Sequence, residues 1–332
     1  NKSQLRHRVG VAVSLRGACK GRGSTTVAVV SEADRYALHG SVADASVCIG
    51  GPRVQDSYLN IPAILSAAVG TGAQAIHPGY GLLSENARFA ALCEACNIVF
   101  IGPDAEMITL LGDKEQARAT MAKAGVPVIP GAGLVPNARI AYREGKRIGL
   151  PLLIKARAGG GGRGIRRVDD LKDIPTAFTA ASTEAKNAFG DGNCYMERML
   201  TKVKHVEIQL ICDDFGNVVC LGERECSVQR KNQKLIEESP SPAVDLNLRK
   251  KMMRAAAAAA KAVGYRNVGT IEFLVDEELK LNTKEMNSSL QVEHPGTEMV
   301  TGVDRVKWQI RVAAGQQGGG QQKELERREH SM

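Results

Sequence analysis

A run of glycines follows a short apolar segment near the middle of the chain. Residues 152–155 read LLIK, and the glycines come next: Gly159, Gly160, Gly161, Gly162 and Gly164. Glycine accepts positive φ and has no side chain, so such a turn can bring several backbone N–H groups onto a phosphate. A lone glycine run is more often a flexible loop, and this one matches neither GxxxxGK[ST] nor GxGxxG. Lys155 and Arg163 lie beside it, however, and these cations favour a triphosphate site.

Oxygen-bearing side chains recur on two predicted strands towards the end of the chain. Glu272 stands between the apolar Ile271 and Phe273, and Glu285 and Asn287 follow in the segment EMNSSLQVEHPGTE. Two carboxylates and an amide oxygen suit Mg²⁺ shared with substrate phosphates rather than a thiophilic metal. The alternative is that these are acids on exposed strand faces, which the apolar neighbours of Glu272 disfavour.

A third polar group, ERECSVQRKNQK, occupies residues 223–234 and leads into LIEESPSP. Taken alone, such a run of charges is typical of a solvated face. As part of an anion site it would contribute Arg230 and Lys234.

The first third of the chain contains the elements of a parallel sheet. Short apolar strands are predicted at 25–30, 46–49, 74–77 and 98–101, with helix-length patterns between them. This alternation predicts a parallel sheet with crossover helices, and the continuous β-branched run at 25–30 predicts a strand buried on both faces. The segment HPGYG after the third strand lies at a carboxyl end, where α/β sheets usually bind ligands.

The rest of the chain alternates helices with short strands. A linker helix is predicted from Thr109 to Gly125, stopped by prolines. Strands at 152–155, 206–211 and 218–221 predict a small α+β unit that contains the glycine loop. The alanine-rich stretch 248–263 predicts a helix that ends at Gly264. Beyond Gly315 the composition predicts a flexible charged tail.

Composition limits the class of protein. With 332 residues the chain can form two or three compact units. Hydrophobic residues make up 43% and charged residues 24%, and no apolar run reaches the ~18 residues of a spanning helix, so we expect a soluble protein. The net charge of +8 is concentrated before the first acid, Glu32, and aromatic residues are only 4%, which disfavours nucleic-acid binding.

The cysteines and the N-terminal residues indicate the cellular compartment of the protein. Eight cysteines are scattered along the chain, and Cys93 and Cys96 form a lone CxxC, so we expect free thiols in a reducing compartment. The basic start lacks the apolar core of a signal peptide. We therefore expect a cytoplasmic location, or the plastid stroma or mitochondrial matrix in a eukaryote.

Six segments carry a family signature: HPGYGLLSEN at 77–86, IGPDAEMITLLGDK at 101–114, the glycine loop at 158–164, HVEIQ at 205–209, ERECSVQRKNQKLIEESPSP at 223–242 and QVEHPGTEMVTGVD at 291–304. Together they resemble the biotin carboxylase family, the ATP-grasp component of biotin-dependent carboxylases such as acetyl-CoA carboxylase. The matches run in order from about Thr25 to Gly315. Asn232, where many members carry His, resembles the cyanobacterial and plastid branch.

The resemblance implies a reaction. ATP phosphorylates bicarbonate to carboxyphosphate, which releases CO₂ to carboxylate biotin on a carrier protein, the first half-reaction of acetyl-CoA carboxylase in fatty acid biosynthesis. Such a reaction needs positioning and charge neutralisation more than a covalent nucleophile. The implied cofactors are ATP and Mg²⁺ or Mn²⁺, with biotin as the carried substrate. The implied partners are a biotin carboxyl carrier protein or domain, a carboxyltransferase and a second copy in a homodimer, without nucleic acid or membrane.

The family's functional residues transfer onto positions of this chain. The metal would be held by Glu272, Glu285 and Asn287. Bicarbonate would be held by Lys234, Gln291, the Val292 backbone and Glu293, with Glu293 and Lys234 as the catalytic residues and Glu293 as the base. ATP would be held by Lys114, Lys155, Gly159, Gly160, Gly161, Gly162, Gly164, Glu197, Met199, His205, Gln229, Asn232 and Leu274.

The resemblance also implies the fold: α/β and α+β, an ATP-grasp protein with an N-terminal parallel-sheet, Rossmann-like domain. We expect an N-terminal domain at 1–108, linker helices at 109–130 and a mobile lid with the glycine loop at 131–202. A central ATP-grasp domain at 203–315, truncated relative to the family, and a tail at 316–332 would complete the chain.

Some positions depart from the family pattern. The start, NKSQLRHRVGVAVSL, replaces the family's first strand and glycine turn, so we expect an incomplete N-terminal sheet. Arg157 and Ala158 replace Ser and Gly, and the polar segment 280–284 should pack weakly. Ser289 replaces the arginine thought to stabilise the biotin enolate, and a second arginine belongs to a region that the family has beyond Gly315. We therefore expect nucleotide binding with poor biotin carboxylation. The rival interpretations are a non-catalytic ATP-binding or interaction protein and another ATP-grasp carboxylate ligase.

Overall fold

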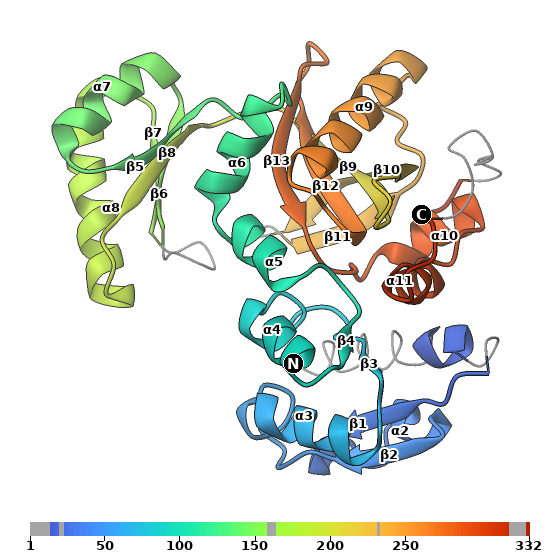
Figure 1. Cartoon of the computed structure of the whole chain (residues 1–332). Helices are drawn as coiled ribbons and strands as arrows, with labels where there is room; N and C mark the ends of the chain where they lie inside the picture. Colours follow the sequence, from blue (N-terminus) through green and yellow to red (C-terminus); the bar gives the residue numbers. More distant parts are fainter. Residues whose placement is uncertain (1–13, 20–22, 158–163, 231–232, 319–329) are drawn as a thin grey trace. The chain divides into compact units, whose positions relative to one another are not determined.

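The computed structural model describes residues 14–19, 23–157, 164–230, 233–318 and 330–332 (Figure 1). The chain divides into two compact units. The first comprises Asn1–Val126, Val206–Glu272 and Glu285–Met332, and the second comprises Pro127–His205 and Phe273–Lys284. The boundaries expected from the sequence, including the lid at 131–202, stay a prediction.

The predicted parallel pairing in the N-terminal region is confirmed. Strand β1 (Val27–Val30) pairs in parallel with β2 (Ala45–Cys48), and β3 (Ala75–Ile76) pairs in parallel with β4 (Val99–Phe100). Within the described residues these form two separate two-stranded sheets rather than one. The expectation that the first strand is buried on both faces is wrong: only Val30 is fully buried, because β1 has a single paired neighbour and β2 is largely exposed.

Helices α3 (Ile61–Gly70) and α4 (Ala87–Ala95) supply most of the N-terminal core. Each begins at an asparagine whose side chain accepts a backbone N–H, from Ala63 and Phe89 respectively, as helix starts require. Shorter elements complete this region: α2 (Leu38–Val42), η1 (Glu32–Asp34) and η2 (Val54–Asp56).

The linker helix predicted from Thr109 to Gly125 is two helices. They are α5 (Ala105–Gly112) and α6 (Lys114–Lys123). Asp113 separates them in an extended conformation, and its side chain accepts the backbone N–H groups of Glu115 and Gln116. Apolar periodicity alone does not reveal such a break, because Asp113 ends one helix and caps the next.

The second unit contains a four-stranded antiparallel sheet in the order β5-β8-β6-β7. Its strands are β5 (Gly131–Val135), β6 (Leu152–Ala156), β7 (Ile165–Val168) and β8 (Cys194–Arg198). Helices α7 (Ala138–Ile148) and α8 (Ile174–Phe189), the latter preceded by η3 (Leu171–Asp173), pack their apolar residues against this sheet (Figure 1). The core therefore lies between one layer of helices and one sheet.

A five-stranded sheet in the order β11-β10-β9-β12-β13 forms the other large layer. Its strands are β9 (Lys204–Cys212), β10 (Val218–Arg230), β11 (Gln233–Glu238), β12 (Asn267–Val275) and β13 (Leu281–Asn287). The strands predicted at 206–211 and 218–221 are present, but they belong to this sheet and not to the sheet that flanks the glycine loop. Their grouping with that loop is wrong, since sequence proximity does not decide which strands pair.

Three helices accompany this sheet: α9 (Leu246–Ala262), α10 (His294–Thr301) and α11 (Arg305–Ala313). The alanine-rich helix is confirmed: Asp245 caps its start, and Gly264 follows its end with a φ of 66°. The polar segment 281–287 forms β13 at the edge of this sheet, where Val128 makes a parallel bridge with Thr283 and the Thr283 N–H donates to the Pro127 carbonyl at 2.8 Å.

The last residues of the chain lie beside β11, while the flexible charged tail expected from the composition stays a prediction. Residues 319–329 lie outside the described part. Ser331 exchanges two backbone hydrogen bonds of 2.8 Å with Ser239, directly after β11, and His330 Nε2 lies 3.3 Å from Glu238 Oε2. Backbone pairing of this kind depends on an available strand edge and leaves no trace in composition.

Two further findings concern the class of the protein. Among the described residues, no helix combines the length and apolar character needed to cross a bilayer. All eight cysteines are described, and none of them forms a disulfide bond.

Arg305 carries a buried guanidinium with few partners. The residue is 0% exposed; Nη2 donates to the Gly269 carbonyl at 3.4 Å, while Nε and Nη1 have no hydrogen-bond partner in the described structure. Burial, and secondarily Arg224, lower the pKa of Arg305 to about 9. The side chain is still charged at neutral pH, so its desolvation destabilises the fold.

We therefore expect Arg305→Met to raise the free energy of unfolding at pH 7 by about 1–4 kcal/mol, as apolar replacement of buried charges can do. Urea unfolding followed by circular dichroism measures this. Arg167→Met is the matched control, because Arg167 is exposed beside Asp169 and its loss should leave the unfolding midpoint unchanged. A less stable Arg305→Met variant would show that the guanidinium has partners that compensate its burial.

Candidate active site

The ammonium group of Lys234 on β11 lies among three carboxylates. It is 2.8 Å from Glu207 Oε2 and 3.9 Å from Glu272 Oε1, and it also forms an ion pair with Glu293 Oε1. Burial alone would lower the pKa of Lys234, but Glu207 and the other nearby acids outweigh it and raise the pKa. Lys234 is therefore a fixed cation at neutral pH, which is what an anion site requires.

Glu207 is paired with Arg224, and both side chains are fully buried. Arg224 Nε and Nη2 donate to Glu207 Oε1 at 2.9 and 2.7 Å. Burial would raise the pKa of Glu207, but Arg224 and then Lys234 reverse this and lower it to about 2. The charged form of Glu207 is thus maintained in a dry environment, because two cations compensate it.

Gln291 and His294 lie at the start of α10, next to this pair. Arg224 Nη2 donates to Gln291 Oε1 at 2.6 Å, and Nη1 donates to Thr297 Oγ1 at 3.0 Å. His294 Nδ1 lies 2.9 Å from the Gln291 carbonyl oxygen and so donates its proton to it. Burial lowers the pKa of His294 to about 4, so the imidazole is neutral at physiological pH.

The structure brings together most of the residues expected to hold bicarbonate. Lys234 contacts Glu293 directly and is linked to Gln291 through Glu207. Val292 and Glu293 form the turn that precedes α10. Three segments distant in the sequence, which contain Glu207, Glu272 and Glu293, therefore converge on the Lys234 ammonium.

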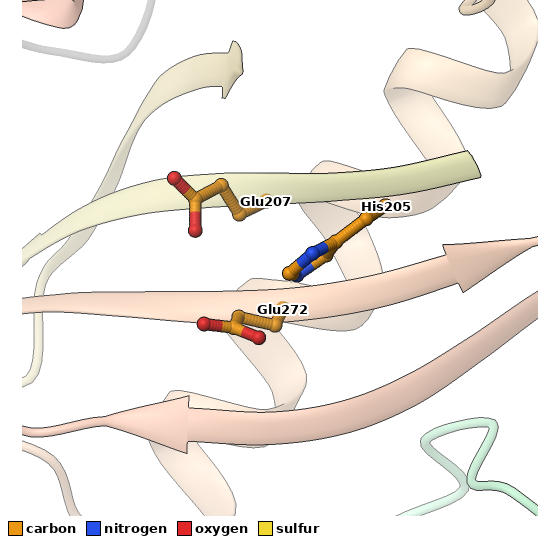
Figure 2. A group of neighbouring side chains, drawn as sticks. All are labelled: His205, Glu207 and Glu272. Carbon is orange, nitrogen blue, oxygen red and sulfur yellow. The ribbon is translucent and has the colours of Figure 1, made fainter. Parts of the chain in front are cut away.

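Two of the three expected metal ligands are in contact. Asn287 Nδ2 donates to Glu272 Oε1 at 2.7 Å, and Glu285 lies two residues before Asn287 on β13, hence on the same face of that strand. Rotation of the Asn287 amide would present its oxygen instead of its nitrogen. The donor set is entirely oxygen and fits Mg²⁺ or Mn²⁺. Figure 2 shows Glu272 on β12 beside Glu207 and His205 of the adjacent strand β9.

The expected nucleotide residues are distributed over both units. In the second unit, Lys155 on β6 forms an ion pair with Glu197 on β8, and the Met199 N–H donates to the Pro151 carbonyl at 2.9 Å. In the first unit, Lys114 begins α6, and Gln229 Nε2 donates to the Cys226 carbonyl at 2.7 Å. Two further members of the set lie on strands: His205 is buried on β9, and Leu274 lies on β12.

The glycine loop connects β6 to β7. Gly159, Gly160, Gly161, Gly162 and Arg163 lie outside the described residues, as does Asn232. Gly164 is described: its φ is 73°, and a Cβ there would come within 2.6 Å of the Ala156 Cβ. Any side chain at 164 would therefore clash with β6, which accounts for the last glycine of the run.

Sequence reasoning missed Glu207 and Arg224. Glu207 stands between Val206 and Ile208, the same pattern of an acid within an apolar strand that singled out Glu272. That signal would have found it. Arg224 gave no comparable signal, because it lies within the charged segment 223–234. The structure divides this segment: Glu223, Arg224 and Glu225 are buried, whereas Val228, Arg230 and Gln233 are exposed.

Ser289 follows β13 and faces an acid from the N-terminal region. Its Oγ donates to Glu85 Oε1 at 3.2 Å, and the Ser288 hydroxyl lies 3.4 Å from the same oxygen. No cation is recorded beside Glu85 among the hydrogen bonds and ion pairs of the described residues. The position that carries arginine in the family pattern is thus a small neutral residue next to a carboxylate.

Comparison with known proteins defines the class first. Residues 5–108 match the family described as "Biotin carboxylase, N-terminal domain", and residues 113–318 match "Carbamoyl-phosphate synthase L chain, ATP binding domain". The biotin carboxylase structure from Campylobacter jejuni, titled as a β-γ-ATP complex, superimposes with a TM-score of 0.90 at 48% identity, over 96% of this chain and 72% of that one. The expected fold class is confirmed: the chain is an ATP-grasp protein with a parallel-paired N-terminal region.

Curated relatives then define the family. The biotin carboxylase of Nostoc sp. (strain PCC 7120) is 50% identical over 317 residues, which cover 95% of this chain and 71% of the relative. Biotin carboxylase 1 of Bacillus subtilis is 48% identical, over 98% of this chain and 73% of the relative. The chloroplastic biotin carboxylase of Arabidopsis thaliana is 46% identical, over 100% of this chain and 62% of the relative. The chain belongs to the biotin carboxylase family.

One solved structure bears on the ligands. The biotin carboxylase domain of the Hydrogenobacter thermophilus 2-oxoglutarate carboxylase, titled as a dimer with MgADP, ADP and bicarbonate, superimposes with a TM-score of 0.88 at 44% identity. The superposition covers 96% of this chain and 71% of the Hydrogenobacter thermophilus chain.

Proposed function

We propose that this chain is an ATP-grasp ligase that uses ATP and bicarbonate to carboxylate biotin on a carrier protein or domain. The observation that carries the proposal is the Lys234 ammonium, fixed among buried carboxylates with Gln291 and Glu293 beside it and with the Glu272–Asn287 pair adjacent. A fixed cation next to an oxygen-rich metal set suits an anion that receives a phosphoryl group. Family membership at 50% identity supports the same conclusion.

The residues of this site would act on bicarbonate one after another. Lys234 and Gln291 would hold the anion, and Glu293 would remove its proton as the oxygen attacks the γ-phosphorus of ATP and ADP leaves. The resulting carboxyphosphate would break into CO₂ and phosphate, the phosphate would accept the proton of biotin N1, and N1 would attack CO₂. Mg²⁺, held by Glu272, Glu285 and Asn287, would neutralise charge on the phosphates. Lys155, Glu197 and the glycine loop would hold the nucleotide.

Two alternatives remain testable against this proposal. A non-catalytic nucleotide-binding protein would show no bicarbonate-dependent ATP hydrolysis, and an ATP-grasp ligase for another carboxylate would show no stimulation by biotin. ATP hydrolysis measured with and without bicarbonate and free biotin separates the three. The carrier protein, the carboxyltransferase and a homodimer are the partners that the proposal implies.

We expect Mg·ATP to stabilise the folded chain even if turnover is slow. Ligand at ~100 times its dissociation constant should add about 2.7 kcal/mol, which thermal unfolding detects readily. ATP with EDTA should give a smaller shift, and Lys155→Met should weaken the response because one cation near the phosphates is lost. The absence of any shift with millimolar Mg·ATP, in protein shown to be folded, would contradict nucleotide binding.

A further inference from the structure

Lys234 and Gln291, two residues expected to hold bicarbonate, are both bonded to one buried ion pair. Glu207 Oε2 accepts from Lys234 Nζ at 2.8 Å, while Arg224 Nη2 donates to Gln291 Oε1 at 2.6 Å. We infer that Glu207 and Arg224 form a positioning unit, which fixes the Lys234 ammonium and the Gln291 amide for the anion. The inference rests on the proposed function and adds two residues to it.

The two oxygens of Glu207 have different partners. Oε1 accepts both donors of Arg224, and the Cys226 thiol lies 3.2 Å from it. Oε2 accepts Lys234, with Gln291 Nε2 at 3.4 Å. Rotation of the carboxylate would break bonds on both sides at once. Its orientation is therefore determined by Arg224, and the place of the ammonium follows from that orientation.

Arg224 is held equally firmly. Its Nη1 donates to Thr297 Oγ1 of α10 at 3.0 Å, so the guanidinium spans β9, the turn at Gln291 and α10. A lysine side chain is flexible, and its ammonium can donate hydrogen bonds in many directions. A planar guanidinium donates only in fixed directions. The rigid arginine thus supplies the geometry and the lysine supplies the charge nearest the anion.

Stability alone is a poor reason to keep such a pair. A buried ion pair can usually be exchanged for apolar residues of similar volume with neutral or favourable effect on stability. A pair that serves only the fold should therefore tolerate Glu207→Leu combined with Arg224→Met. If the pair has a positioning role, the double variant should fold but use bicarbonate poorly, because Lys234 and Gln291 lose the hydrogen bonds that hold them in place.

The chain offers a matched control in Glu223 and Arg249. Arg249 Nε and Nη2 donate to Glu223 Oε1 at 2.9 and 2.6 Å, and the Glu223 side chain is fully buried. This pair joins β10 to α9, and strand alternation places Glu223 on the opposite face of β10 from Arg224. It has the same chemistry as the positioning unit, and Arg249 Nη2 also lies 3.3 Å from the Val244 carbonyl oxygen.

Steady-state ATP hydrolysis tests the inference. In Glu207→Leu/Arg224→Met we expect the bicarbonate KM to rise at least ~10-fold, the scale of one lost charge-assisted hydrogen bond, with the ATP KM within about twofold. Glu223→Leu/Arg249→Met should leave both constants within about twofold of the unaltered chain. A folded Glu207→Leu/Arg224→Met variant with an unchanged bicarbonate KM would overturn the inference.

Conservative variants cover the case in which the double replacement does not fold. Glu207→Gln keeps the shape of the side chain and removes the charge, and Arg224→Lys keeps the charge and removes the planar fork. Both should raise the bicarbonate KM while leaving the ATP KM unchanged. Unchanged bicarbonate use in both variants would also overturn the inference.

A structural readout separates this inference from the proposed function. If the unaltered chain shows no bicarbonate-dependent hydrolysis, the proposed function fails. Crystal structures of the unaltered chain and of Glu207→Gln still decide the positioning role. Displacement of the Lys234 and Gln291 side chains in the variant supports it, and unchanged positions overturn it.

Discussion

Ser289→Arg should raise biotin-dependent turnover, by as much as ~10²–10³-fold, the scale of one preorganised donor to a developing oxyanion. Deprotonation of the biotin ureido nitrogen creates negative charge on the ureido carbonyl oxygen, and Ser289 is neutral and too short to replace a guanidinium. Its hydroxyl instead donates to Glu85. The affinity for Mg·ATP should hardly change, because none of the expected metal ligands is altered.

Biotin-stimulated ATP hydrolysis and carboxybiotin formation measure this gain. Ser289→Met is the matched control, because it adds length without charge and should leave turnover low. The Glu85 carboxylate should pair with the new guanidinium, so Glu85→Gln combined with Ser289→Arg shows how much of the effect depends on that pairing. Rapid biotin carboxylation by the unaltered chain would contradict the role assigned to position 289 and point to another cation such as Arg230 or Lys284.

Lys234→Met should reduce bicarbonate-dependent ATP hydrolysis by ~10²–10³-fold, since it removes the preorganised cation from the anion site. Glu207, Glu272 and Glu293 would then lose a shared counter-ion. Mutual repulsion should also lower the thermal unfolding midpoint. The stabilisation by Mg·ATP should persist, so that loss of turnover is separated from loss of nucleotide binding.

Lys280→Met provides the control for Lys234→Met. Lys280 pairs with Glu278, and both side chains are about 70% exposed. Exposed pairs contribute little to stability, so both hydrolysis and the unfolding midpoint should be unchanged. Normal bicarbonate-dependent hydrolysis by folded Lys234→Met would remove Lys234 from the mechanism and leave the anion to Gln291 and the backbone.

Hydrogen bonds formed in the folded chain decided features of the secondary structure that local sequence patterns did not predict. The sequence predicted strands at 206–211 and 218–221 correctly but placed them beside the glycine loop, whereas they belong to the five-stranded sheet. Apolar periodicity predicted one helix from Thr109 to Gly125, although the family resemblance implied linker helices at 109–130, and Asp113 separates α5 from α6. The pairing of Ser331 with Ser239 at the end of the chain had no counterpart among the sequence-based expectations. In each case the deciding interaction is a hydrogen bond that periodicity and composition do not encode.

The sequence by itself determined the family, the parallel pairing of the N-terminal strands and the alanine-rich helix that ends before Gly264. These depend on ordered motifs and on local propensity, which act over a few residues. It also singled out Lys234, Glu272, Asn287 and Glu293 as residue types suited to an anion and a metal.

Only the tertiary structure showed that Lys234 is held by Glu207 and Glu207 by Arg224, and that Ser289 faces Glu85. Glu207 and Lys234 are on different strands, β9 and β11, with β10 between them. Which charges compensate one another in a buried site depends on strand order and register. Those are set by the packing of the whole sheet rather than by the residues next to each charge.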